Sequence, residues 1–384
     1  MTVPLQLPAH IVDKIMELID KVSEPYYLYD TAVIRHICRA LQEIPYKNKA
    51  IHLATQASNH EIILNIMREE GILMFVNSLP HLQMVLEHGY TKDEIIFTAS
   101  AMNETAMQQV HDAGAMVNLD SMKQVNQWQS LFPDAKFGIR CNIGSLLETL
   151  ITHGGVYIGK GSRLGLSPEE IKSLSGNNNV AGLHLYLGTN INEIEYFHRC
   201  YSTLCEFATL FPQIEYINVG GGFALENNTD GFNFTEYGLM VTEVMAQLSN
   251  KTGRAIKLIM EPGRVITGQA GYFVCRVTDI KTIEGRQLVG VNASCAQFPR
   301  PLFHPDVAFH PATIIKGHEK SIYQDLIPSA IYGCSTYSND YLSRDVMLPV
   351  AEVGDIIVLG EAGSYCAACY TNFLGFPPAK EIFI

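Results

Sequence analysis

Three consecutive glycines, Gly220 to Gly222, end an apolar run of the chain, and the segment Glu261-Pro-Gly-Arg264 follows further on. Glycine has no Cβ, so backbone N–H groups in such a loop can approach a bound phosphate closely. Gly263 and Arg264 could add an amide and a guanidinium to the same anion. A glycine triplet alone is also explained by a tight turn, but an acid and an arginine around Pro-Gly are not a generic loop.

The carboxylate of Glu261 suggests what lies at the other end of the ligand. An acid in a pocket can pair with a protonated ring nitrogen, while the glycines and Arg264 hold a phosphate. A ring that carries both groups describes pyridoxal 5'-phosphate. Keeping Glu261 and Arg264 in an apolar pocket without a ligand would be unfavourable, so we expect an anionic ligand there.

Eight apolar, β-branched runs would form the strands that position these residues. They alternate with helical patterns such as 59–71, where apolar residues recur at helical spacing and Gly71 ends the segment. This alternation predicts a (β/α)8 TIM barrel, in the α/β class, rather than a doubly wound sheet. The runs are 50–55, 73–76, 94–99, 116–119, 136–142, 181–188, 214–221 and 256–261.

Polar residues gather where these runs end, and in barrels that rim is where sites are built. Loops are polar in any protein, so each of these residues also has a plain structural explanation. They include Gln56, Asn77, Ser78, Asp120, Ser121, Arg140 and Thr189.

After about residue 268 the pattern changes to short β-rich segments separated by Gly, Pro and Asp. We therefore predict two domains. Residues 26–267 would form the barrel with the pyridoxal-phosphate-type site, and 268–384 a mostly-β C-terminal domain. Residues 1–25 are candidates for packing on the second domain.

Composition narrows the class of protein. The chain has 384 residues, 47% of them apolar, and a net charge of −12 without a basic run, which argues against partners such as nucleic acid or a membrane surface. The N-terminus lacks a signal-peptide pattern, so we expect a cytoplasmic protein. The nine cysteines are scattered and contain a single C-x-x-C, Cys366 with Cys369, so we expect free thiols and no metal.

Seven segments occur in the order found in one known family. The chain resembles the fold-type III pyridoxal-phosphate decarboxylases, the ornithine, diaminopimelate and carboxynorspermidine decarboxylase group, which is related in fold to alanine racemase. The resemblance implies a barrel with a C-terminal β-domain and a homodimer whose partners share their active sites. The segments are "PYYLYD" (25–30), "GLHLYLGTNI" (182–191), "NVGGGF" (218–223), "EPGR" (261–264), "NASCAQFPRPLF" (292–303), "GCSTYSNDYL" (333–342) and "GEAGSYCAACYTNFLGF" (360–376).

The resemblance also implies roles for single residues. Arg300, in "RPLF", matches an arginine that grips a substrate carboxylate in several family members, and Arg140 is a second candidate for the substrate. Arg163, in "SRLG", matches the carboxynorspermidine branch. The expected cofactor contacts are Thr189, Gly220, Gly221, Gly222, Glu261, Gly263, Arg264 and Tyr365.

The family's reactive lysine is missing. Its first strand ends in a segment like "YALKAN", whose lysine forms the Schiff base with the cofactor, and here that position is Gln56. An amide nitrogen is not a nucleophile. The family's histidine on the pyridine face is replaced by Tyr186, which can still stack on a ring. Phe75 replaces an aspartate.

The residues expected from the dimer partner also depart from the family pattern. The family's proton-donating cysteine stands four residues before an aspartate, and here that position is Thr336 before Asp340, with Cys334 two positions displaced. Thr336 or Cys334 could donate a proton only with help. Asp340 could point toward a substrate amine or serve as a turn residue.

Three interpretations remain open. Gln56 could be an engineered substitution. The chain could be a natural homologue that binds the cofactor noncovalently, or accepts an amine already condensed with it, and removes carbon dioxide from an amino acid or conjugate with a second anionic group. It could also be a catalytically silent relative that binds or regulates a partner and in which the cofactor is absent.

Overall fold

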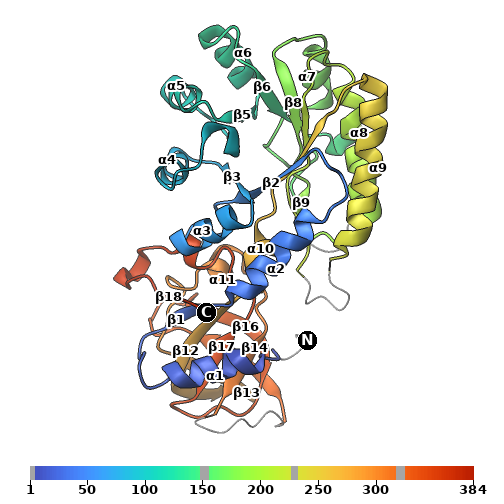
Figure 1. Cartoon of the computed structure of the whole chain (residues 1–384). Coiled ribbons are helices and arrows are strands. Elements are labelled where there is room, and N and C mark those ends of the chain that lie inside the picture. Colours follow the sequence, from blue (N-terminus) through green and yellow to red (C-terminus); the bar gives the residue numbers. More distant parts are fainter. Residues whose placement is uncertain (1–4, 148–154, 226–231, 317–324) are drawn as a thin grey trace. The chain divides into compact units, whose positions relative to one another are not determined.

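The computed structural model describes residues 5–147, 155–225, 232–316 and 325–384 (Figure 1). The chain divides into two compact units, Arg35–Val265 and a second unit made of Met1–Ile34 with Ile266–Ile384. The sequence placed the start of the barrel domain at residue 26. Strand β1 (Tyr26–Tyr29) pairs with β12 and β18 of the second unit, and the division follows it.

Eight of the described strands close into a parallel barrel in the order β10-β11-β2-β3-β4-β5-β6-β8. Each overlaps one of the predicted runs, and the prediction of a (β/α)8 barrel is confirmed. Their bounds are β2 (Lys49–Ala54), β3 (Leu73–Val76), β4 (Ile95–Ala99), β5 (Met116–Leu119), β6 (Phe137–Arg140), β8 (Val180–His184), β10 (Tyr216–Asn218) and β11 (Lys257–Met260).

Helices between successive barrel strands lie outside them, with one further helix before β2 and a short one after β11 (Figure 1). Serine caps several of these helices: Ser78, Ser121 and Ser167 each accept a hydrogen bond from a backbone N–H in the first turn. Two of the rim serines singled out in the sequence, Ser78 and Ser121, are therefore helix caps. The helices are α2 (Thr31–Gln42), α3 (Glu61–Glu69), α4 (Leu79–Glu87), α5 (Glu104–Ala113), α6 (Met122–Leu131), α7 (Pro168–Ser173), α8 (Ile194–Ala208), α9 (Phe234–Thr252) and the short α10 (Arg264–Thr267).

Short elements complete the barrel unit. Strands β7 (Gly155–Val156) and β9 (Gly188–Thr189) pair in an antiparallel ladder after β6 and β8. The 3-10 turns η1 (Lys92–Glu94) and η2 (Gly144–Leu146) precede β4 and follow β6.

A polar layer fills the barrel interior below the rim. The phenol of Tyr216 occupies the space that two glycines leave, because a Cβ on Gly138 or Gly182 would overlap its ring. Its hydroxyl donates to Asn118 Oδ1 at 2.8 Å, and Asn118 Nδ2 donates to Thr98 Oγ1 at 3.0 Å. Burial raises the pKa of Tyr216, so the phenol is neutral and closes the interior as a hydrogen-bonded plug.

The second unit is mostly β, as predicted. Its described strands form an 8-stranded sheet in the order β14-β17-β12-β13-β15-β16, with β1 joining β12 to β18. Helix α1 (Ala9–Leu18) packs Ile11 and Ile15 into the core of this sheet. The other elements are β12 (Gly271–Ile283), β13 (Arg286–Val291), β14 (Ala312–Ile315), β15 (Ile327–Tyr332), β16 (Tyr341–Leu348), β17 (Ile356–Leu359), β18 (Lys380–Phe383), α11 (Arg300–Phe303), η3 (Ala367–Cys369) and η4 (Phe373–Gly375).

Candidate active site

The rim at the carboxyl ends of the barrel strands carries most of the predicted site residues. Glu261 follows β11 directly, and the glycine triplet follows β10 with only Val219 between them. Gln56 follows β2, which lies between β11 and β3 in the barrel. A backbone hydrogen bond of 3.2 Å from Ala54 N to Pro262 O joins these two strand ends. The barrel therefore brings the expected anion loop, the acid and the lysine position to one edge.

The buried carboxylate of Glu261 is held by side chains from two neighbouring strands. His184 Nε2 of β8 lies 3.2 Å from Oε2, and Asn218 Nδ2 of β10 donates to Oε1 at 2.5 Å. Asn218 Oδ1 in turn accepts the N–H of Gly220 at 3.0 Å. One network thus links the acid to the first glycine of the triplet.

Glu261 is ionised in spite of its burial. Burial raises its pKa, but the charge and hydrogen bond of His184 and the hydrogen bond from Asn218 outweigh burial and leave the pKa below its ordinary value. Among the described residues, the buried Nδ1 atom of His184 has no hydrogen-bond partner. A buried carboxylate of this kind suits a cationic partner such as a protonated ring nitrogen.

Packing of the backbone alone requires the three glycines. A Cβ on Gly220 would lie 2.6 Å from Leu185 O, one on Gly221 2.5 Å from Glu261 O, and one on Gly222 2.6 Å from Gly188 O. Gly220 and Gly222 also have positive φ angles of 65° and 102°. The triplet therefore has a structural cause that is independent of any phosphate.

The cationic part of the expected phosphate site lies on the same side of the barrel. Arg264 begins α10, and its Nη2 donates to Thr189 Oγ1 at 2.9 Å. Thr189 belongs to β9, which follows β8. Gly263 lies between Glu261 and Arg264 in sequence, so its amide is at the same strand end.

At the position of the family lysine, an amide pair replaces the amine. Asn77 Nδ2, which follows β3, donates to Gln56 Oε1 at 2.5 Å. Phe75, at the position of the family aspartate, is 9% exposed and packs with the apolar residues of the barrel interior. These three residues place no amine at the ends of β2 and β3.

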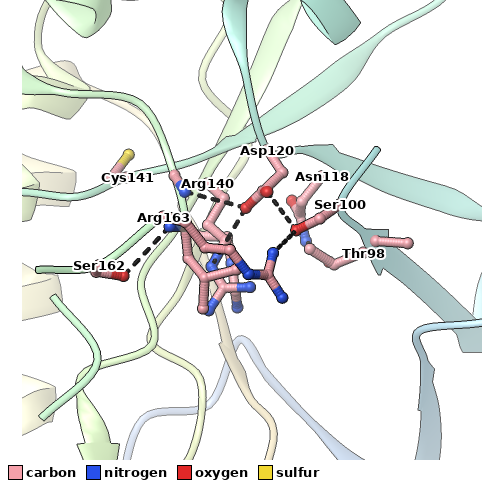
Figure 2. A network of polar contacts seen from close by, with 12 residues as sticks. Thr98, Ser100, Asn118, Asp120, Arg140, Cys141, Ser162 and Arg163 are labelled. Carbon is pink, nitrogen blue, oxygen red and sulfur yellow. Dashed lines mark hydrogen bonds and ion pairs between the residues drawn. The ribbon is translucent and has the colours of Figure 1, made fainter. Parts of the chain in front are cut away.

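A second polar network lies at the ends of β4, β5 and β6 (Figure 2). Ser100 Oγ donates to Asp120 Oδ2 at 2.5 Å, and Arg163 Nη1 donates to Ser100 Oγ at 3.0 Å. The backbone N–H of Gly165 donates to Asp120 Oδ1 at 3.0 Å. The carboxylate of Asp120 thereby fixes the loop that carries Arg163.

Arg140, the last residue of β6, lies beside this network. Its Nε is 3.8 Å from Asp120 Oδ1, and its guanidinium lies 6.0 Å from the centroid of the Tyr186 ring. Tyr186 stacks on Tyr157 with 5.6 Å between ring centroids. The predicted ring-stacking residue and one predicted substrate residue are therefore neighbours.

Arg300, Thr336, Cys334, Asp340 and Tyr365 all belong to the second unit. Arg300 is 6% exposed, and its Nη1 lies 2.9 Å from His310 Nε2. Since His310 Nδ1 contacts Gly360 O at 3.0 Å, that nitrogen carries the proton and Nε2 accepts from Arg300. The Arg300 guanidinium thus has a fixed partner on its own unit.

Asp340 is a heavily hydrogen-bonded carboxylate of the second unit. Oδ1 accepts from Cys295 N at 2.6 Å, and Oδ2 accepts from both the backbone N–H and the hydroxyl of Ser335, at 3.0 and 2.5 Å. Thr336 and Cys334 are exposed residues, and partial burial of the Cys334 thiol, with the charge of Asp340, raises its pKa. The roles predicted for these three residues stay predictions.

Tyr365 adopts a backbone φ of 56°, in the left-handed region that non-glycine residues rarely occupy. Such a conformation persists where surrounding structure enforces it, and it often accompanies a functional segment. Its predicted contact with a phosphate stays a prediction.

Residues 31–268 match the family of the pyridoxal-dependent decarboxylases, in its pyridoxal binding domain. The chain belongs to this family. The diaminopimelate decarboxylase of Escherichia coli K12 is 22% identical to it over 378 residues, covering 93% of this chain and 88% of that protein.

Solved structures of decarboxylases share the fold over nearly the whole chain. A diaminopimelate decarboxylase structure matches with a TM-score of 0.86 at 21% identity and covers 97% of this chain and 91% of that one. The lysine/ornithine decarboxylase of Vibrio vulnificus, complexed with putrescine, matches with a TM-score of 0.82 at 21% identity and covers 99% of each chain.

The residues present fit pyridoxal phosphate in its ring and phosphate parts, although they differ from the family at the tether, at Tyr186 and at Phe75. Glu261 provides an ionised acid for the ring nitrogen, and Tyr186 is a partly exposed aromatic face. Arg264 and the triplet stand at one strand edge, whereas Gln56 offers an amide.

Sequence reasoning missed several contributors to this site. His184, Asn218 and Ser100 were not among the expected site residues, and the structure places buried His184 and Asn218 against Glu261 and Ser100 against Asp120. The available signal was a polar residue inside an apolar strand, in "GLHLY" and "YINVG".

Other classes of site leave no trace in the part of the chain that the structure describes. There, His, Cys, Asp and Glu form no group of three or more that could hold a metal ion. All nine cysteines are free thiols. None of the helices within the described ranges is both long and apolar enough for a membrane span.

Proposed function

We propose that this chain is a pyridoxal-phosphate-dependent decarboxylase-like protein that holds its cofactor, or the cofactor already condensed with an amine, by noncovalent contacts alone. The observation that carries the proposal is the carboxylate of Glu261, which is 6% exposed, ionised and fixed by His184 and Asn218 at the rim of the barrel. His184 and Asn218 stabilise this acid as an anion, and a buried anion at the rim suits a cationic group such as a protonated ring nitrogen.

The residues assigned to the cofactor divide into three parts. Glu261 would bind the ring nitrogen, and Tyr186 would cover the ring face. The phosphate would lie among Thr189, Gly220, Gly221, Gly222, Gly263 and Arg264, with Tyr365 as a further contact. When bound, the cofactor supplies the electron sink that loss of carbon dioxide needs.

The chain's own residues limit the reaction at the entry of substrate. Gln56 cannot attach the cofactor and hand it to an incoming amine, because its amide nitrogen is not nucleophilic. We therefore expect slow or altered decarboxylation of an amino acid, or of an amino-acid conjugate, that bears a second anionic group. Arg300 and Arg140 are the candidates for reading that group.

We further propose a cytoplasmic homodimer in which each site is completed by the β-domain of the other copy. Thr336 and Cys334 would then approach the reacting carbon, and Asp340 would set the conformation of their loop, since its carboxylate binds Cys295 N and Ser335. This arrangement is an expectation from the family resemblance.

Binding of pyridoxal phosphate to the purified protein tests the proposal. Titration calorimetry should show saturable binding, gel filtration should remove the cofactor, and borohydride should not fix it to the chain. Absence of any affinity, or attachment that borohydride makes permanent, would refute it. Carbon dioxide release from a panel of amino acids with added cofactor then measures the activity.

A catalytically silent binding partner is the second candidate. Two observations favour it: the amide pair of Gln56 and Asn77 at the lysine position, and the exposed Thr336 at the position of the family cysteine. A protein that binds the cofactor but releases no carbon dioxide from any amino acid, alone or mixed with a family decarboxylase, would belong to this class.

A further inference from the structure

The rim above β4, β5 and β6 carries two cations that none of the proposed cofactor contacts uses (Figure 2). Arg140 ends β6, and Arg163 lies in the loop after β7. Both are connected to Asp120, Arg140 directly through the 3.8 Å ion pair and Arg163 through the hydroxyl of Ser100. Figure 2 shows both guanidiniums extending to the same side of the network.

Asp120 does not hydrogen-bond Arg140. Its Oδ2 accepts from Ser100 and its Oδ1 from the backbone of Gly165, whereas Arg140 Nε lies 3.8 Å from Oδ1, which is an ion pair longer than a hydrogen bond. Within the described ranges the Arg140 guanidinium donates no hydrogen bond, although its side chain is only 14% exposed. A guanidinium has five N–H donors, and donors with so little access to water normally have acceptors.

The charges around Arg140 also favour an incoming anion. Burial lowers the pKa of Arg140, and the nearby charge of Arg163 lowers it further, whereas Asp120 and Glu261 raise it. If Glu261 is taken by a protonated ring nitrogen, Asp120 alone faces two guanidiniums. One additional negative charge then restores the balance.

We propose that Arg140 and Arg163 form the subsite for the second carboxylate of the substrate, the one that is retained. This inference rests on the proposed function and makes it more specific. Guanidinium groups bind a planar carboxylate through paired hydrogen bonds. The stacked rings of Tyr186 and Tyr157 place an aromatic wall beside Arg140, next to the expected position of the cofactor ring.

The same chemistry indicates which carboxylate binds there. A guanidinium stabilises a carboxylate as an anion, and the departing carboxylate leaves its charge behind on the substrate as it becomes neutral carbon dioxide. Holding the departing group in this way would stabilise the ground state more than the transition state and slow the reaction. The subsite therefore suits a dicarboxylic amino acid or a conjugate with a distal carboxylate.

Three stable ligands test the inference by adding one carboxylate at a time. They are the reduced, secondary-amine adducts of pyridoxal phosphate with cadaverine, lysine and diaminopimelate, which need no lysine on the protein. We expect the wild type to prefer the diaminopimelate adduct over the lysine adduct. Arg163→Gln should reduce this preference about tenfold, as for the loss of one charge-assisted hydrogen bond, and leave the cadaverine adduct within about twofold.

Two further variants serve as controls: one keeps the positive charge of the subsite but changes its hydrogen-bonding geometry, and one removes an arginine outside the subsite. Arg140→Lys keeps the charge but loses the fork, so it should reduce the same preference. Arg254→Gln removes an exposed arginine beyond the end of α9 and should change nothing. Unchanged affinity for the cadaverine adduct shows that each variant still folds.

The outcomes distinguish this inference from the proposed function. If Arg163→Gln and Arg140→Lys keep the full preference for the diaminopimelate adduct over the lysine adduct, the subsite assignment is wrong while cofactor binding stands. The assignment is also wrong if these variants lose only the gain in affinity from the cadaverine adduct to the lysine adduct. The same holds if the wild type binds all three adducts equally. If the wild type binds none of them, the proposed function fails and the subsite falls with it.

Discussion

Two adjoining stretches of the barrel rim have kept different parts of a decarboxylase site. At the ends of β8, β10 and β11, a buried acid is fixed by a histidine and an asparagine next to a glycine loop. At the ends of β2 and β3, an amide pair and a buried phenylalanine stand where the family has a nucleophile and an acid. The two stretches are joined by the hydrogen bond from Ala54 N to Pro262 O.

Under the proposed function, this difference separates ligand recognition from covalent reactivity between neighbouring strands. Recognition depends on a network of several side chains, of which Glu261, His184 and Asn218 are all present. Reactivity depends on one amine, so a single substitution removes it. The contrast can be tested from both sides.

Restoring the amine should give the largest effect. Gln56→Lys places a nucleophile at the end of β2, beside the proposed cofactor site, so we expect borohydride to fix pyridoxal phosphate to this variant and not to the wild type. Mass spectrometry of the digested protein would locate the label. The control is Gln83→Lys on exposed α4, which should remain unlabelled. Equal labelling of both variants would contradict the contrast.

The β2 side should dominate the response to acid. His52 of β2 is 2% exposed, and burial lowers its pKa to about 4 from 6.5. The unfolded chain therefore takes up a proton at His52 below pH 6.5 while the folded chain does not until pH 4, so stability falls as the pH falls through this window. The shift corresponds to at most about 3 kcal/mol.

His52→Asn should flatten the dependence of unfolding free energy on pH in that window, as measured by denaturant titration at several pH values. His36→Asn, at an exposed position of α2, should leave it unchanged. An identical slope for wild type and His52→Asn would mean that His52 is protonated in the folded protein.

Neutralising the acid should weaken recognition without touching the β2 side. Glu261→Gln removes the charge that would meet the ring nitrogen, at a loss of about 1.5–3 kcal/mol for a charged hydrogen bond, or roughly tenfold to a hundredfold in affinity for pyridoxal phosphate. Calorimetry measures this directly. Glu195→Gln, exposed on α8, is the matched control. Unaltered affinity in Glu261→Gln would place the ligand elsewhere.

The smallest expected change concerns the loop between these strands. Gly221→Ala brings a Cβ to 2.5 Å from Glu261 O, so the backbone must shift, and we expect a loss of about 1–3 kcal/mol in stability by thermal or denaturant unfolding. Gly161→Ala, where a Cβ meets nothing within 4 Å, should be neutral. Equal stability of the two variants would show that the loop yields at no cost.

The sequence predicted the barrel because strand and helix patterns are local. The predicted run 181–188 was nevertheless too long. β8 ends at His184, so Tyr186 lies beyond the strand, in the segment that follows it. The partnership of Ser100, Asp120 and Arg163 joins three separate strand ends and loops. No spacing of residues in the sequence predicts such a contact.

The hydrophobic pattern of the sequence did not predict the boundary between the two domains, for a related reason. β1 reads as an ordinary apolar strand, and only its pairing with β12 and β18 assigns it to the β-domain. Likewise, nothing in the sequence shows that Arg140 lacks a hydrogen-bonding partner. Strand pairing and the hydrogen bonding of buried side chains are properties of the fold, because they depend on segments that are distant in the sequence.

The glycine triplet has an evolutionary consequence. Its absent side chains make room for neighbouring carbonyl groups whether or not a phosphate is ever bound. Selection for a foldable barrel is then enough to preserve "GGG", and a descendant that abandoned its ligand long ago would still display the motif. The acid beside it has no such protection, so the loss of Glu261 would be the earlier sign that a lineage has given up the cofactor.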